Sequence, residues 1–323
     1  MPAIARRALP ALALLAAAAV PPAARAQAPR PLSLVVPFPA GGDTDVTARF
    51  LAERLALRLN RPVMVDNRSG ATGTIGALHV ARAAPDGDTL LFTPSTFATA
   101  PLVLRRGAGY HPVDDFVPVA LTTTTPLILL ASRASGIRSL AELRAAAAAG
   151  RIANYGTPGS GSPMHILGQM FNRAAGIELA EVAYRGVAPL INDMLAGTIA
   201  LGYATPAVAA AHIRAGTLVP LAVSERERSP LAPDVPSFVE LGFPGLVLPS
   251  WSGVFAPRGT PAAVTTMLSG HFATILAQGD VRSRMADLVV VPGSGDPAAL
   301  AAIVADQFGR IGAIVRELGI QVE

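Results

Sequence analysis

The sequence contains no cysteine and no lysine among its 323 residues, and only 5% of the residues are aromatic. Without cysteine the chain forms no disulfide and has no thiolate to act as a nucleophile or to hold an iron–sulfur cluster. It also offers no cysteine for a lipid anchor. Without lysine it has no Schiff-base residue and no P-loop lysine for a bound nucleotide. These absences exclude several large classes of enzyme.

Charge is also scarce, because charged residues make up 15% of the chain and hydrophobic residues make up 51%. This composition is too apolar for a disordered chain and supplies a sizeable core. All 26 basic residues are arginine, and the 22 acidic residues leave a net charge of +4. Three arginines lie in a segment that we expect to be removed, which brings the net charge to about +1. Nucleic-acid binders usually carry a clustered basic patch, so we expect no nucleic-acid partner.

Residues 1–26 have the three parts of a secretory signal peptide. Arg6 and Arg7 form its positive region, and residues 8–20 form an apolar stretch that is too short to span a membrane. Residues 24–26 then fit the rule of small residues at a cleavage site. We expect cleavage after Ala26 and a periplasmic mature chain. The sequence leaves open whether the Sec or the twin-arginine pathway exports it.

Strand-like apolar segments alternate with helical segments along the whole mature chain. Residues 32–36 form a short apolar run, and the following helical segment places Leu51, Leu55 and Leu59 on one face. Glycine follows several of the expected helices, where it is the usual C-cap residue. This alternation predicts βα units, and therefore an α/β fold with parallel-rich sheets and flanking helices.

The middle of the chain is a self-contained run of βα units. Residues 122–125 and 249–253 flank this run, and we interpret them as two crossings between lobes. We therefore predict a signal peptide at 1–26, a first lobe formed by 27–124 and 252–323, and a second lobe formed by 125–251. Two lobes joined by two crossings form a hinge with a cleft between them.

Each lobe has a glycine-rich turn that joins a strand to a helix. The free N–H groups and the positive dipole end at such a helix start attract anions. Ligands of open parallel sheets also bind beyond the carboxyl ends of the strands. Two such turns in different lobes therefore predict a shared anion site. The candidate ligand-binding residues are Phe38, Ala40, Gly41, Gly42, Asp45, Ser95, Thr157, Ser160, Gly161, Ser162 and Thr205.

Two side chains near these turns have more than one interpretation. Asp45 can pair with Arg49 four residues later, or it can accept a hydrogen bond from a ligand amine or a water. His165 is expected to be a packed or hydrogen-bonded histidine rather than a ligand contact. Catalytic patterns are poor, because no Gly-x-Ser-x-Gly motif is present and the five histidines lack zinc-site spacing. We expect no enzymatic activity, no cofactor and no metal site.

A series of ordered motifs resembles the tripartite tricarboxylate transporter solute receptors, the Tct/Bug family, over essentially the whole mature chain. The motifs are VPFPAGGDTD at 36–45, VDNR at 65–68, GATG at 70–73, PDGDTL at 85–90, PVDDF at 112–116, GSGS at 159–162, YRG at 184–186 and WSGVFAP at 251–257. Two residues depart from the family pattern. Ala183 stands where proline is usual, and Arg185 stands where lysine is common.

The resemblance implies a type II-like periplasmic-binding-protein fold that closes on a small carboxylate. In this family the loops here spanning 38–45 and 157–162 hold the ligand carboxylate, largely through backbone amides and ordered waters. The resemblance also implies delivery to the permease subunits of a tripartite tricarboxylate-type transporter, and we expect a monomer. Two alternatives are an exported hydrolase that uses Ser160 or Ser162, and a ligand-sensing protein that serves a membrane sensor. The identity of the carboxylate stays open.

Overall fold

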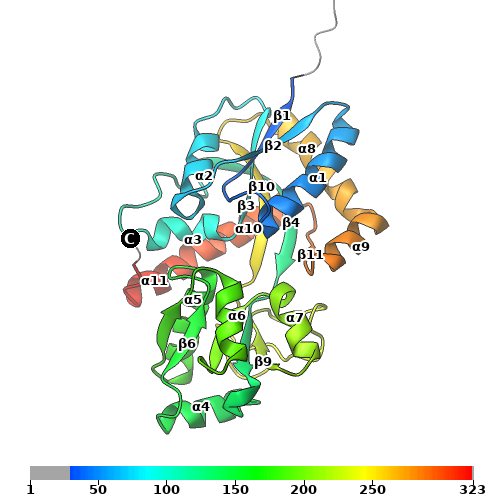
Figure 1. The fold of residues 1–323 in the computed structure, drawn as a ribbon. Coiled ribbons are helices and arrows are strands. Elements are labelled where there is room, and N and C mark those ends of the chain that lie inside the picture. The colour runs from blue at the N-terminus through cyan, green and yellow to red at the C-terminus, as the bar shows by residue number, and fades with distance from the viewer. Residues whose placement is uncertain (1–29, 322–323) are drawn as a thin grey trace, which may run out of the picture.

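The computed structural model describes residues 30–321, and the expected signal peptide lies outside the described residues. Two sheets with flanking helices form two lobes, which Figure 1 shows one above the other. This arrangement confirms the predicted two-lobe α/β fold. The exact division of the chain between the lobes stays a prediction.

The first lobe has a six-stranded sheet in the order β11-β4-β10-β3-β1-β2. Its strands are β1 (Leu32–Val36), β2 (Val63–Asn67), β3 (Thr89–Pro94), β4 (Phe116–Thr125), β10 (Ser250–Pro257) and β11 (Val291–Pro292). Its helices are α1 (Asp43–Leu59), the short turn η1 (Ala71–Gly73), α2 (Thr74–Ala81), α3 (Thr96–Val103), α8 (Ala262–Ala277), α9 (Gly279–Asp287) and α10 (Pro297–Asp306).

The second lobe has a five-stranded sheet in the order β7-β6-β8-β5-β9. Its strands are β5 (Ile128–Ser132), β6 (Asn154–Thr157), β7 (Ala180–Ala183), β8 (Leu201–Ala204) and β9 (Leu218–Val223). Its helices are the short turn η2 (Arg133–Ser135), α4 (Leu140–Ala148), α5 (Pro163–Ala175), α6 (Val187–Leu195) and α7 (Pro206–Arg214).

Both sheets are mixed, because the strands next to the crossings run against their neighbours. β1 pairs in parallel with β2 and β3, as the βα pattern predicts, whereas β10 runs antiparallel to both β3 and β4. The chain leaves the first sheet at the end of β4 and returns at the start of β10. The two crossing segments therefore lie side by side, with Thr125 opposite Ser250 and Thr123 opposite Ser252.

The helix packing follows the leucine spacing read from the sequence. In α1, Leu51 and Leu55 are fully buried against the first sheet and Leu59 packs against the same cluster, whereas Leu57 on the opposite face is 79% exposed. Helix ends follow the glycine pattern as well. Gly176 ends α5 at a φ of 65°, a left-handed conformation that costs glycine little.

The C-terminal helical segment Pro297–Glu317 connects the two lobes. It consists of α10, a π-helical turn η3 (Gln307–Ile311) and α11 (Gly312–Glu317). Its length and apolar composition would suffice to cross a membrane, but its buried apolar side chains lie in the cores of the two lobes. Leu300 belongs to a cluster of the first lobe and Ile311 to a cluster of the second. The sequence assigned residues 252–323 to the first lobe, whereas the structure packs α11 against the second.

The π-helical turn is attached to the returning crossing by one glutamine. Gln307 is 1% exposed, and its Oε1 accepts a hydrogen bond from Nε1 of Trp251 at 3.0 Å. Its Nε2 donates to the carbonyl oxygen of Pro249 at 2.9 Å. The helical segment is thus a third connection between the lobes, beside the two crossings.

Candidate functional site

The glycine turn of the first lobe leads directly into α1. Gly41 has a φ of 84°, which strongly favours glycine, and Gly42 is the N-cap residue of α1. No side chain caps the first turn of this helix. The N–H groups at the start of an α-helix have no partner within the helix. The loop therefore presents backbone donors and the positive end of the helix dipole.

Asp45 holds this loop in place from within the helix. Its side chain is only 3% exposed, and it accepts hydrogen bonds from the Gly41 N–H at 2.8 Å and from Nε of Arg49 at 2.9 Å. The predicted pair with Arg49 is confirmed. Asn67 at the end of β2 donates to Asp45 at 2.8 Å and to the carbonyl oxygen of Phe38 at 3.1 Å. The carboxylate thus ties both ends of the loop to α1 and β2.

The electrostatics of Asp45 favour its charged form. Burial raises the pKa of the Asp45 carboxyl, but the hydrogen bonds that it accepts outweigh burial, so its pKa lies below the ordinary value. The hydrogen bonds that the Asp45 carboxylate accepts come from Gly41, Arg49 and Asn67 of the protein itself. This arrangement suits a residue that shapes the loop, and direct contact of Asp45 with a ligand stays a prediction.

The glycine turn of the second lobe follows β6 and leads into α5. Ser162 caps α5, because its Oγ accepts a hydrogen bond from the His165 N–H at 3.2 Å. The imidazole of His165 folds back, and its Nδ1 accepts from the Gly161 N–H at 2.9 Å. His165 is 9% exposed and is therefore a hydrogen-bonded, packed histidine, as predicted. Burial lowers its pKa, and Glu181 only partly opposes this.

Sequence reasoning missed Glu181, which faces this turn from β7. The hydroxyl of Thr157 donates to one carboxylate oxygen, and the hydroxyl of Ser160 donates to the other at 2.6 Å. Nε2 of His165 lies 3.5 Å from the second oxygen. No local pattern shows this contact, because β7 becomes the parallel neighbour of β6 only in the fold, where Glu181 lies opposite Tyr155.

The same contacts argue against a serine hydrolase. A catalytic serine gives its proton to an adjacent base, usually a histidine that a carboxylate orients. Here Ser160 donates to Glu181 rather than to His165, and Ser162 caps its own helix. Within residues 30–321, no cluster of three or more His, Asp or Glu side chains could hold a metal ion.

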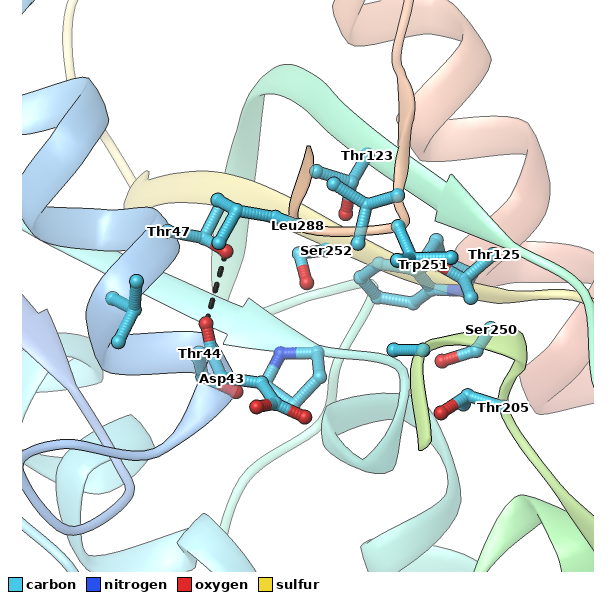
Figure 2. Close-up of a pocket in the computed structure, with 15 residues that line it drawn as sticks. Asp43, Thr44, Thr47, Thr123, Thr125, Thr205, Ser250, Trp251, Ser252 and Leu288 are labelled. Carbon is cyan, nitrogen blue, oxygen red and sulfur yellow. Dashed lines mark hydrogen bonds between the residues drawn. The ribbon is translucent and has the colours of Figure 1, made fainter. Parts of the chain in front are cut away.

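A pocket of about 270 Å³ lies where the two lobes meet, and Figure 2 shows it in close-up. Its walls come from the start of α1, the crossing strands β4 and β10, the start of α7 and the segment after α9. Seven of its side chains carry hydroxyls, and none of the residues that line it is basic. The hydroxyl residues are Thr44, Thr47, Thr123, Thr125, Thr205, Ser250 and Ser252.

Thr205 is the one predicted candidate that lines this pocket among the residues described. It is the N-cap residue of α7, yet its hydroxyl makes no capping bond to that helix. Figure 2 shows it beside Ser250, so the hydroxyl belongs to the pocket wall. Ser95 lies immediately behind this wall. It is 1% exposed, and its Oγ is 3.2 Å from the Oγ of Ser250.

The tripartite tricarboxylate transporter family receptor profile matches residues 47–320. The chain belongs to this family. It is 34% identical to the protein BugT of Bordetella pertussis over 308 residues, which cover 94% of each chain. It is also 37% identical to a UPF0065 protein of Bordetella bronchiseptica over 265 residues, 81% of this chain and 78% of the relative.

Solved structures of similar proteins agree with this assignment. An R. palustris protein solved with adipate superposes with a TM-score of 0.77 at 32% identity, covering 91% of this chain and 99% of the other. MatC from Rhodopseudomonas palustris, solved with malate, has a TM-score of 0.74 at 32% identity, covering 89% and 99%. The family and its structural neighbours are solute-binding proteins rather than enzymes. The chain is thus a periplasmic solute-binding receptor.

Proposed function

We propose that this receptor binds a small carboxylate in the cleft between its lobes. The uncapped start of α1, which Asp45 holds in place, carries the proposal. Its backbone N–H groups are fixed before the ligand arrives, and preorganised donors lose little entropy on binding. The hydroxyl-lined pocket next to Asp43 and Thr44 receives the remainder of the ligand. Neighbours of this chain solved with adipate and malate support the same ligand class.

The residues that line the pocket indicate which chemical groups the ligand can carry at the end away from the bound carboxylate. Its one ionisable side chain is Asp43, and no basic residue lines it. A second carboxylate in this pocket would therefore rely on hydroxyl donors alone. Hydroxyls both donate and accept hydrogen bonds, so they also suit the hydroxyl or carbonyl groups of an acid that is charged at one end only.

Closure of the lobes on the ligand completes the mechanism. The crossings β4 and β10, together with the π-helical turn, lie beside the pocket and form the hinge. The closed receptor then delivers its carboxylate to the membrane components of a tripartite tricarboxylate-type transporter. The mature chain begins at Gln27 after removal of the signal peptide, and mass spectrometry of the exported protein checks this start.

A thermal-shift screen of the mature chain against a carboxylate panel tests the proposal. A carboxylate present at a thousand times its Kd stabilises the fold by about 4 kcal/mol, which raises the melting temperature by several degrees. The methyl ester of the same compound serves as the control, since it keeps the skeleton and loses the charge. An ester that stabilises as well as its acid, or a panel without any active acid, contradicts the proposal.

A further inference from the structure

The segment that follows α9 gives the pocket an apolar wall. Leu288, Val289 and Val290 all line the pocket, and each of them is partly buried. The hydroxyl residues of the pocket come from other elements, namely the start of α1, the crossing strands and the start of α7. A ligand in this pocket therefore meets hydroxyls from these elements and hydrocarbon from the segment after α9.

The backbone of Val289 is left-handed, with a φ of 55°. Its N–H donates to the carbonyl oxygen of Ala286 at 2.9 Å, and the N–H of Val290 donates to that of Met285 at 3.0 Å. These two bonds form the Schellman motif that ends many helices, and glycine is the usual residue at the left-handed position. A β-branched residue in this conformation is a genuine outlier.

The chain uses glycine at the same position of other helices. Gly176, Gly197 and Gly216 follow α5, α6 and α7, with φ values of 65°, 77° and 67°. Valine after α9 therefore costs stability that glycine would not cost. Strained residues of this kind cluster at ligand sites. Of these four left-handed residues, Val289 is the one that lines the pocket.

Both ends of the apolar segment are attached to the first lobe. On one side α9 is anchored by Met285, which is fully buried in the first-lobe core. On the other side β11 pairs with β4 and sets Val291 opposite Thr124, and the N–H of Gly293 donates to the carbonyl oxygen of Thr122 at 2.8 Å. The wall is thus fixed before a ligand arrives, so it can discriminate between ligands of different shape and polarity.

We propose that this apolar wall selects an acid whose carboxylate and polar far end are joined by an aliphatic chain, and that Val289 is the specificity-determining residue. The inference rests on the proposed function and narrows its ligand class. Each methylene that is buried against the wall contributes about fourfold to affinity. An acid with hydroxyls along its chain would instead place them against hydrocarbon, where they lose water without gaining a partner.

Calorimetry with 6-hydroxyhexanoate and gluconate tests this selectivity, because both acids have six carbons and one charge and differ in the hydroxyls along the chain. We expect the parent to bind 6-hydroxyhexanoate about tenfold more tightly than gluconate. The substitution Val289→Asn introduces a polar side chain that tolerates the left-handed backbone. It should abolish most of this preference and also raise the melting temperature by a few degrees, since it relieves the strain.

Two further variants separate the contact from other effects. Val289→Ala keeps a Cβ on the same backbone and loses only the two methyl groups, so it should weaken 6-hydroxyhexanoate binding and leave gluconate binding unchanged. The matched control is Val113→Asn, an exposed valine of the first lobe that does not line the pocket, which should change neither affinity.

The outcomes distinguish this inference from the proposed function. A parent that binds gluconate as tightly as 6-hydroxyhexanoate, or that binds neither, overturns the inference, and so does an unchanged preference in Val289→Asn. In each of these cases binding of another carboxylate of the panel leaves the proposed function standing. A parent that binds no carboxylate removes both.

Discussion

Replacing Gly42 by aspartate is expected to weaken carboxylate binding about a thousandfold. Two like charges 4 Å apart repel by about 4 kcal/mol at an effective dielectric constant near 20, and this energy corresponds to roughly three orders of magnitude in Kd. The backbone accepts the side chain, since Gly42 has a φ of −78° and the new Cβ would lie 3.5 Å from the nearest atom, a carbonyl oxygen of Pro39. The loss therefore arises from charge and not from strain.

This variant should separate binding from stability. Aspartate is a favoured N-cap residue, so Gly42→Asp should leave the free energy of unfolding unchanged or raise it by a few tenths of a kcal/mol. Gly42→Asn is the matched control, because asparagine caps a helix equally well without the charge. It should lose far less affinity in calorimetry. Binding by folded Gly42→Asp as tight as that of the parent would show that the start of α1 is not the anion site.

Replacing Asp45 by alanine is expected to destabilise the protein by about 2 kcal/mol, within the range for leaving buried hydrogen-bond donors without their acceptor. The change leaves the Gly41 N–H and the Asn67 amide without their shared acceptor. The free loop then loses its fixed shape, and carboxylate affinity should fall with it. Urea denaturation measures the first effect and calorimetry the second. Glu53→Ala is the control, because Glu53 lies exposed on the same helix and does not line the pocket.

The loss of folding stability at acid pH should also depend on Asp45. The pKa of Asp45 is lower in the folded state than in the unfolded chain, so its contribution is complete above the unfolded value near 3.9 and is lost as the pH falls through the folded value. Between these two values the parent should lose stability faster than Asp45→Ala. Parallel stability curves for the two proteins in this range would contradict the assigned role.

The features that the sequence predicts well depend on neighbours along the chain. The leucine spacing of α1 and the glycine after α5 each involve residues close together along the chain, so local rules suffice. The Asp45–Arg49 pair belongs to the same class, since it joins residues four apart on one helix. The two-lobe α/β class follows from the alternation of such segments.

The features that the sequence does not predict depend on residues that only the fold brings together. Asn67 reaches Asp45 because β1 and β2 are neighbours in the sheet, and no local pattern shows this contact. Glu181 reaches Ser160 across two adjacent strands for the same reason. The pocket forms only where the start of α1, both crossings and the start of α7 come together in the fold. Ten of the eleven ligand-binding candidates read from the sequence therefore lie outside its wall.

The link between Trp251 and Gln307 gives this protein an optical reporter of its own. Trp251 is the one tryptophan of the whole chain, and it lines the pocket from the returning crossing. Its indole N–H is bonded to the helical segment that connects the lobes. The proposed closure of the lobes would change the surroundings of this ring, so we expect its fluorescence emission to follow closure without any added label. The absence of cysteine leaves the chain without a native thiol, so a second probe can be placed at any single introduced cysteine and read against the same tryptophan.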